Sequence, residues 1–276
     1  MTASGAGDAR EVAESAANSR PMGWLARIGL TARGLVYIVI GWLAVLVGLG
    51  GRANIDQRGA LTEVLAQPYG AVMLWLLTIG FAAYALWRLS EAVFGATGEG
   101  KKAGPRLRSL ARGVAYAALA LTARSLQQGA SGTQAGQQGD LAGTVMQHTG
   151  GRWIVGIVGI LVLVVGLAMV REGWSTTFLR SFGSLPPGLR AAVIWLGRTG
   201  TIARGVVFAV SGLLVVVAAW TVDPAKAGGV DQAFRTLLLE PFGTVLVVLL
   251  GAGLILFGVY GLAEAAWRRV TDGDQA

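Results

Sequence analysis

The sequence of 276 residues contains no cysteine and a single histidine, His148. Without cysteine the chain can form no disulfide, no thiolate metal site and no thiol nucleophile. One histidine excludes a bis-histidine haem and a histidine metal cluster within the chain. A catalytic triad would have to use the same histidine, and no spacing supports one. We therefore expect no catalytic residues, no metal and no cofactor, and predict that the protein is not an enzyme.

Charge is also scarce, because only 14% of the residues are charged while 54% are hydrophobic. The charges lie in gaps between long apolar runs, which is unusual for a soluble protein of this size. The charge-free runs are Gly34 to Gly51, Val64 to Trp87, Trp153 to Val170, Gly205 to Val222 and Pro241 to Ala263. At about 1.5 Å per residue, each covers most of a hydrocarbon core roughly 30 Å thick. The sequence therefore predicts five clear membrane spans.

One motif occurs three times: an arginine stands six residues before an Arg-Gly pair that opens an apolar run. The pairs are Arg33-Gly34, Arg112-Gly113 and Arg204-Gly205, preceded by Arg27, Arg106 and Arg198 and followed by the aromatic residues Tyr37, Tyr116 and Phe208. Such self-similarity indicates one structural unit repeated along the chain. The second copy marks a sixth, weaker span from near Ser109 to about Gln128, which Arg124 interrupts.

The second span of each unit repeats as well. Copies one and three begin it with a Pro-aromatic-Gly turn at Pro68 and Pro241, which Thr149-Gly150-Gly151 replaces in copy two. We predict an all-α membrane protein with six transmembrane helices, arranged as three tandem helical hairpins in a pseudo-threefold bundle. The predicted divisions are a mobile tail at 1–22, hairpin repeats at 23–97, 98–180 and 181–270, and a tail at 271–276.

Basic residues set the expected orientation. Most of the 23 lysines and arginines fall in the segments on the side of the amino terminus. By the positive-inside rule, both termini are expected in the cytoplasm. The net charge of +8 indicates contact with anionic lipid at the cytoplasmic face. Nucleic acid is not an expected partner, because no basic patch interleaved with aromatics forms a separate domain.

Small residues recur seven apart in the first span of the repeats. Gly34, Gly41 and Gly48 form one such stripe, and Gly205, Gly212 and Ala219 form its counterpart. Seven residues is close to two helical turns, so each stripe lies on one helix face. We interpret the stripe as a packing seam, because membrane helices associate through small residues. The alternative is that it lines a narrow pore.

Charged residues recur at the expected cytoplasmic boundary. Arg33, Arg112 and Arg204 begin the first helix of each unit, and Glu91, Glu172 and Glu264 end the second. We interpret them as interfacial anchors that form ion pairs within or between hairpins, which avoids burying an unpaired acid. The alternative is a ring of three pairs that closes an inner gate.

Arg124 is expected inside the hydrocarbon layer, about 18 Å along its helix from Arg112 at about 1.5 Å per residue. With Gln127 and Gln128 it forms a candidate binding site for an anion or a polar headgroup. The alternative is that Arg124 snorkels to the outer interface from a short or tilted helix. The stretch from Gln134 to His148 is expected to be a loop. Gly59 to Gln67 and Gln232 to Glu240 are predicted to form short amphipathic helices that lie on the outer surface. The alternative is that they fold over the mouth of the bundle.

The Arg-Gly-aromatic opening, the Pro-aromatic-Gly turn and the closing Glu91-Ala92 and Glu264-Ala265 resemble an uncharacterised bacterial membrane family, domain of unknown function 1206. In that family a two-helix unit occurs three times, and the resemblance covers about residues 24 to 269. It implies a six-helix inner-membrane protein and no activity. Mitochondrial carriers also triplicate a hairpin, but their Pro-x-acid-x-x-base signature is absent, so that comparison is analogy only.

Two functions fit these patterns. The first is a non-catalytic membrane scaffold or assembly component, whose basic loops meet lipid or a membrane-protein partner. The second is a transporter or channel for a small anion or polar solute that uses Arg124 as its binding group.

Overall fold

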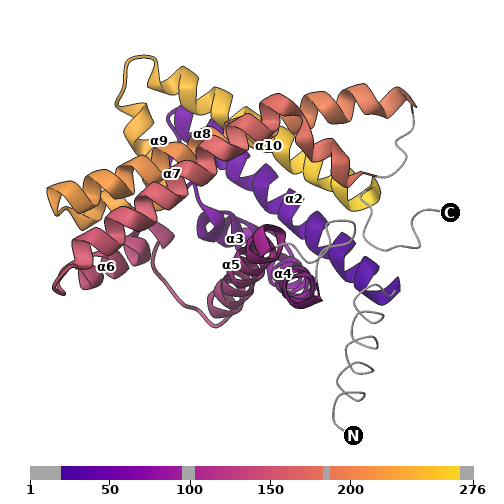
Figure 1. Cartoon of the computed structure of the whole chain (residues 1–276), viewed down its shortest axis with the longest axis horizontal. Coiled ribbons are helices and arrows are strands. Elements are labelled where there is room, and N and C mark those ends of the chain that lie inside the picture. Colours follow the sequence, from indigo (N-terminus) through magenta and orange to yellow (C-terminus); the bar gives the residue numbers. More distant parts are fainter. Residues whose placement is uncertain (1–19, 95–102, 183–186, 268–276) are drawn as a thin grey trace, which may run out of the picture.

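Helices make up the regular structure of the residues that the computed structural model describes, which are 20–94, 103–182 and 187–267 (Figure 1). Each repeat consists of a long helix, a short helix and a second long helix. They are α2 (Arg20–Gly48), α3 (Gln57–Ala66) and α4 (Gly70–Phe94), then α5 (Ala103–Gln127), α6 (Gln134–Met146) and α7 (Gly151–Ser175), then α8 (Pro187–Thr221), α9 (Gly229–Leu238) and α10 (Gly243–Trp267). Two short 3-10 helices, η1 (Thr177–Ser181) and η2 (Pro224–Ala227), follow α7 and α8. The predicted terminal tails lie outside the described residues, except for residues 20–22, which begin α2.

Five of the long helices are long and apolar enough to cross a membrane: α2, α4, α7, α8 and α10. The prediction of five clear spans is confirmed on length and composition. The predicted sixth span corresponds to the long helix α5, whose basic residues, Arg124 among them, leave it far less apolar than the others.

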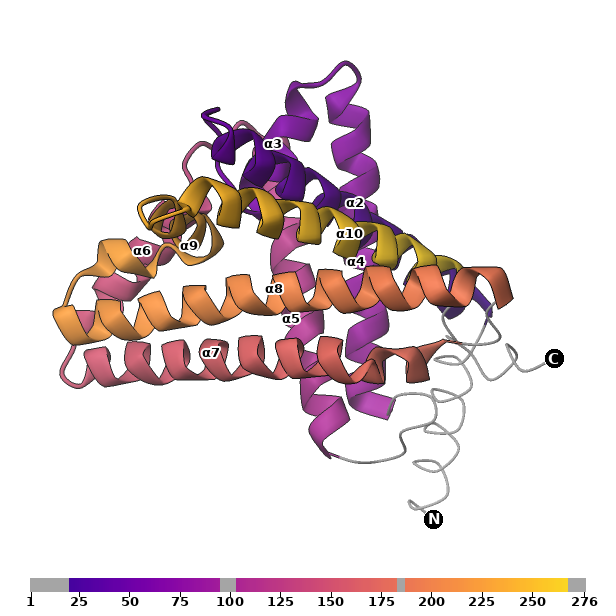
Figure 2. The same ribbon diagram turned by 90° about the horizontal axis from the view of Figure 1, so that it is seen from above.

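The six long helices form three closely packed pairs, which are α4 with α5, α7 with α8, and α10 with α2. The first two pairs join successive repeats, and the third joins the last repeat to the first. In Figure 1 α4 and α5 are seen nearly end-on while the other two pairs cross, and in Figure 2 α7, α8 and α10 run across α4 and α5. Because α2 is the first helix and α10 the last, the third pair closes the three repeats into a ring. Contacts within a repeat are less extensive, so the predicted hairpin is not the unit of closest packing.

The small-residue stripes lie in two of these pairs and let the backbones approach each other. A Cβ atom added to Gly41 of α2 would lie 2.5 Å from the carbonyl oxygen of Gly251 in α10. One added to Gly212 of α8 would lie 2.8 Å from the carbonyl oxygen of Gly159 in α7. The interpretation as a packing seam is confirmed. The neighbouring helix fills the stripe, so it does not line a pore.

The short helices are anchored by buried side chains. The amphipathic helices predicted at 59–67 and 232–240 are confirmed as α3 and α9, and each buries one large residue completely, Leu61 and Phe234. The expectation of a loop after Gln134 is wrong, because α6 occupies this stretch. Thr133 caps α6 by accepting a hydrogen bond from the Gly136 N–H at 3.0 Å, which offsets the low helix propensity of its glycines.

Repeat two lacks the contact that joins the long helices of the other repeats. In repeat one, Gly29 of α2 lies directly against Tyr84 of α4. The equivalent pair in repeat three is Gly200 and Phe257. In repeat two the same positions hold Arg108 and Val165, and α5 and α7 are not closely packed. Val165 is consequently 46% exposed, whereas Tyr84 is fully buried.

Candidate functional site

The repeated motif brings aromatic rings together within two of the helix pairs. An arginine and an aromatic four residues later lie on the same helix face. The buried Tyr116 packs against Tyr84 with ring centroids 4.4 Å apart, and the buried Tyr37 packs edge-on against Phe257 at 4.9 Å. The first contact joins α5 to α4 and the second joins α2 to α10, so each stabilises one closely packed pair.

Arg33 and Glu264 form a buried ion pair between α2 and α10. Their side chains are 8% and 7% exposed, and the Arg33 guanidinium also donates to the Tyr84 hydroxyl at 3.5 Å. The pair joins repeat one to repeat three, so it is an ion pair between units. A charge pair buried this deeply holds the two helices in register, because separating it would leave an uncompensated charge.

Arg88 takes part in the same buried region and was not among the predicted residues. Its Nη1 donates to Glu91 at 2.7 Å, its Nε donates to the Tyr84 hydroxyl at 3.0 Å, and its guanidinium stacks 4.3 Å from the Trp87 ring. Ser109 of α5 also donates to Glu91, at 2.9 Å. The spacing of Arg88 and Glu91, three residues apart on one helix, is the sequence signal that could have identified the pair.

The remaining predicted boundary residues are placed differently. Arg204 stacks on three rings, with its guanidinium 5.1 Å from Tyr37 and from Phe208 and 4.9 Å from Phe257. Within the described parts of the chain no carboxylate forms an ion pair with Arg204, and Glu172 is exposed. Arg112 is also exposed. The three predicted Arg–Glu positions are therefore not equivalent in their contacts.

In copies one and two, the first arginine of the motif donates hydrogen bonds to carbonyl groups at the carboxyl end of a helix from another repeat. Arg27 Nη1 donates to the carbonyl oxygen of Ala265 at 2.9 Å, and Arg106 Nε donates to that of Ala92 at 2.8 Å. These acceptors are equivalent positions at the ends of α10 and α4. In the third copy, Arg198 instead stacks 4.9 Å from the Trp174 ring. A cation at a helix carboxyl end satisfies its free carbonyls and interacts well with its dipole.

Arg124 lies on the outer surface of the α4–α5 pair. Its guanidinium is 4.9 Å from the Trp75 ring, and its Nη1 is 3.4 Å from the Gln127 amide oxygen. Gln127 donates in turn to Thr78 at 3.1 Å. Gln128 is exposed beyond the end of α5. The structure thus brings Arg124 and Gln127 together but leaves Gln128 outside the group.

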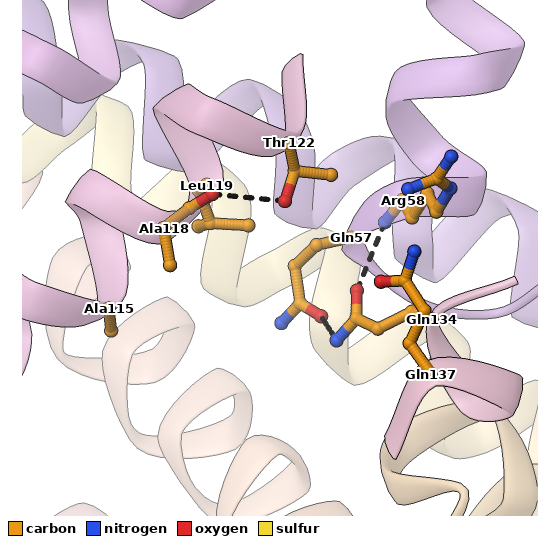
Figure 3. A pocket seen from close by; sticks show the side chains of 8 residues that line it. All are labelled: Gln57, Arg58, Ala115, Ala118, Leu119, Thr122, Gln134 and Gln137. Atoms are coloured by element: carbon orange, nitrogen blue, oxygen red, sulfur yellow. Dashed lines mark hydrogen bonds between the residues drawn. The ribbon is translucent and has the colours of Figure 1, made fainter. Parts of the chain in front are cut away.

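A cavity of about 230 Å³ lies between α3, α5 and α6, away from Arg124. It is lined by Gln57 and Arg58 from α3, Ala115, Ala118, Leu119 and Thr122 from α5, and Gln134 and Gln137 from α6. Figure 3 shows the α5 residues on one side and the three glutamine side chains on the other. The site therefore combines an apolar wall with glutamine amides and the side chain of Arg58.

The α5 wall of the cavity corresponds to sealed core in repeat one. Ala115, Leu119 and Thr122 occupy the positions that Val36, Ile40 and Leu43 occupy in α2. Those three residues of α2 are only 1% to 3% exposed. Alanine in place of valine removes volume, and threonine in place of leucine adds a hydroxyl. The cavity thus exists where repeat two departs from the core pattern of repeat one.

Hydrogen bonds fix part of the polar wall and leave part of it available. The Gln134 amide donates to the Gln57 oxygen at 3.0 Å and accepts from the Arg58 backbone N–H at 3.2 Å. In the part of the chain that the structure describes, neither the side-chain NH₂ group of Gln57 nor the side-chain amide of Gln137 makes a hydrogen bond. The buried Arg58 side chain donates from Nη2 to the carbonyl oxygen of Ala130 at 2.9 Å.

Two acids lie near the cavity at the start of α3. Asp56 caps α3 by accepting from the Gly59 N–H at 2.7 Å, while its other oxygen is buried without a hydrogen bond. Asp231 of α9 accepts from the Ile55 N–H at 2.7 Å and from Arg235 at 2.6 Å. Burial raises the pKa of the Asp56 carboxyl, the hydrogen bond from Gly59 lowers it by less, and the charge of Asp231 raises it again. Among the described residues no group of three or more acids or histidines could hold a metal ion.

Comparison with known proteins places the chain in an uncharacterised group. The family model for Domain of Unknown Function (DUF1206) matches residues 28–95, 107–176 and 199–268, most of the chain. An uncharacterised protein of Bacillus subtilis (strain 168), YxxB, is 27% identical over 252 residues, which cover 89% of this chain and 90% of that protein. No solved structure matches.

Proposed function

The chain belongs to the DUF1206 family, and we propose that it is a non-catalytic, multi-pass protein of the bacterial plasma (inner) membrane that acts as a scaffold or assembly component. The observation that carries the proposal is the closure of the three repeats into a ring by the ion pair between Arg33 and Glu264. A protein whose first long helix is fixed to its last by a buried ion pair presents surfaces of fixed geometry. Fixed surfaces suit the positioning of other molecules.

In this proposal all six long helices cross the membrane, including α5. Although α5 is less apolar than the others, it packs closely along α4, which has the length and composition of a membrane span. Gly113 of α5 lies directly against Leu89 of α4. A helix packed along a spanning helix occupies the same layer of the bilayer, where its backbone hydrogen bonds are satisfied internally.

Both termini are assigned to the cytoplasm from the distribution of basic residues. Arg27 lies at the end of α10 and Arg106 at the end of α4, so these two basic side chains gather on one side of the ring. In this orientation the exposed arginines of that side contact anionic lipid headgroups. The outward apolar faces contact lipid or a membrane-protein partner.

No observation favours transport of an anion through Arg124. That residue stacks on Trp75 at the outer surface, and it does not line the cavity. A long cationic side chain on a lipid-facing surface can reach the interface by snorkelling.

Two experiments test the proposal. The chain contains no thiol, so single cysteines can be placed at Ser131 and Thr271 and labelled. The cysteine at Ser131 should be labelled from outside the cell, and the one at Thr271 only after permeabilisation. Equal labelling of both would refute the six-span arrangement. Purified protein in liposomes should conduct no chloride or phosphate. An anion flux that is abolished by Arg124→Val and kept by Arg152→Val would refute the scaffold proposal and support a transporter.

A further inference from the structure

We propose that the cavity between α3, α5 and α6 binds the headgroup and ester oxygens of a membrane phospholipid, whose chains lie against exposed apolar side chains of α5 and α7. This goes beyond a scaffold role and rests on the proposed membrane location of α5. The chemistry of the cavity wall, the size of the cavity and the exposed residues beside it support this ligand class.

The polar wall supplies donors to an oxygen-rich group. The NH₂ groups of Gln57 and Gln137 are available, since no protein acceptor takes them among the described residues. Arg58 is 4% exposed, and its Nε has no hydrogen-bond acceptor within the described structure. A buried donor left without an acceptor costs free energy, which an incoming phosphate or ester oxygen would recover.

The size of the cavity limits what fits inside it. Its volume of about 230 Å³ is below the roughly 300–1,000 Å³ of pockets that enclose whole drug-sized ligands. It therefore accommodates a polar fragment whose remainder lies outside. A phospholipid has this form, with a compact polar region joined to long apolar chains.

Part of the α5 wall of the cavity is exposed. Ala115, Ala118 and Thr122 lie on the same helical stripe as position 108, which is equivalent to Gly29. In repeat one Gly29 lies directly against Tyr84 of α4, whereas α5 and α7 are not closely packed in repeat two. Ala115 and Ala118 are exposed.

Apolar side chains of α7 are exposed at the equivalent positions. Val158, Leu161 and Val165, at the positions of Leu77, Gly80 and Tyr84, are 49%, 59% and 46% exposed. In repeat one these positions are buried. Repeat two therefore leaves apolar surface on α7 uncovered, and acyl chains match such a surface.

Lipid retention measured by native mass spectrometry tests the proposal. Wild type is purified from membranes, stripped with detergent and incubated with phosphatidylglycerol and phosphatidylethanolamine. We expect wild type to retain one lipid. Gln57→Leu combined with Gln137→Leu should weaken binding roughly tenfold, because two hydrogen bonds are lost. Gln147→Leu, on an exposed glutamine outside the cavity, is the matched control and should bind as wild type does.

A second variant fills the cavity with the residues of repeat one. Ala115→Val with Thr122→Leu should abolish lipid retention and raise the melting temperature of the lipid-free protein, because the core of repeat one is restored. Thr144→Leu is its control, since both threonines donate to a backbone carbonyl four residues earlier and Thr144 is exposed outside the cavity.

Three outcomes would overturn the proposal. One is equal lipid retention by wild type and both cavity variants. Another is no lipid on correctly folded wild type that passes the topology test, which leaves the scaffold proposal intact. The third is protection by soluble glycerol 3-phosphate without any lipid, which would assign the site to a free phosphate ester instead.

Discussion

Arg33 and Glu264 form a buried ion pair although 231 positions separate them in the chain. The contact joins the first long helix to the last and makes a ring of three repeats. Its charges lie among aromatic rings, with the Arg33 guanidinium 5.6 Å from the centre of Phe257. Closure of the ring therefore depends on a charge pair that water does not reach.

We expect Arg33→Met and Glu264→Gln each to lower the free energy of unfolding by about 3–5 kcal/mol, because each removes one partner of a buried ion pair. The double variant should lose less than the sum of the two. Thermal unfolding in detergent measures these changes. The exposed pair Lys226–Asp223, at 3.5 Å, is the control and should contribute about 0–1 kcal/mol. Additive losses at Arg33 and Glu264 would show that the pair does not stabilise the ring.

Gly41→Ala should destabilise the protein by about 1–3 kcal/mol, because the added methyl group overpacks the seam. The new Cβ would lie 2.5 Å from the backbone oxygen of Gly251, which cannot move without shifting α10. Gly104→Ala is the matched control in α5, since no atom lies within 4 Å of its added Cβ. That change should be neutral or stabilise by up to ~1 kcal/mol. A melting temperature that falls equally in both variants would contradict the seam.

Arg124→Val should increase membrane insertion of the isolated α5 segment. On insertion scales an arginine near the helix centre costs about 2.5–3.5 kcal/mol, which the valine of the other copies does not incur. A glycosylation-reporter insertion assay measures the fraction inserted. Arg106→Val, near the cytoplasmic end, is the control and should raise insertion less. No gain from Arg124→Val would mean that α5 lies outside the hydrocarbon layer or that its arginine already reaches the interface.

Asp56→Asn should change how stability depends on pH. Because burial raises the folded-state pKa of Asp56, the folded protein holds this proton more tightly than the unfolded chain does. The stability from Asp56 is therefore fully present below its ordinary pKa of about 3.9 and is lost as the pH rises through the raised value. Asparagine still caps α3 and does not titrate. The advantage of Asp56→Asn over wild type should thus grow with rising pH and then level off.

Thermal unfolding of both proteins from about pH 4 to pH 8 checks this window. Asp231, the other buried acid of this region, is unchanged in both proteins, so the difference between them isolates Asp56. A difference that shrinks with rising pH would show that the Asp56 carboxylate is stabilised in the folded protein.

Internal repeats made much of the helical order predictable. The Arg-Gly pairs begin no helix, but each lies on one face of the long first helix, and the seven-residue spacing of Gly34, Gly41 and Gly48 identified the packing face. The partner of that face was not predictable, because a stripe of small residues fits any neighbouring helix with a matching stripe. The pairing of α10 with α2 depends on the arrangement of all three repeats, so the residue spacing within one helix cannot predict it.

The cavity was missed for a different reason. Its signal lies in the differences between the copies, with Arg108 at the position of Gly29 and Thr122 at the position of Leu43. Aligning the copies for similarity singled out Arg124 instead, because a charge inside an apolar run is conspicuous. Loss of a glycine or of core volume does not stand out in a hydropathy pattern as a charge does. It becomes meaningful only when the contacts of the equivalent residues are known.

The pairing of α2 with α10 has a consequence for biosynthesis. The ribosome makes α2 first and α10 last, so the glycine face of α2 lacks its partner until nearly the whole chain has been made. During that time Gly41 and Arg33 lack the contacts with α10 that they make in the folded protein. The α4–α5 and α7–α8 pairs can form as they emerge, whereas the ring closes only at the end of synthesis. A chain truncated before α10 therefore displays an unfilled seam, a feature by which quality control can distinguish incomplete molecules from finished ones.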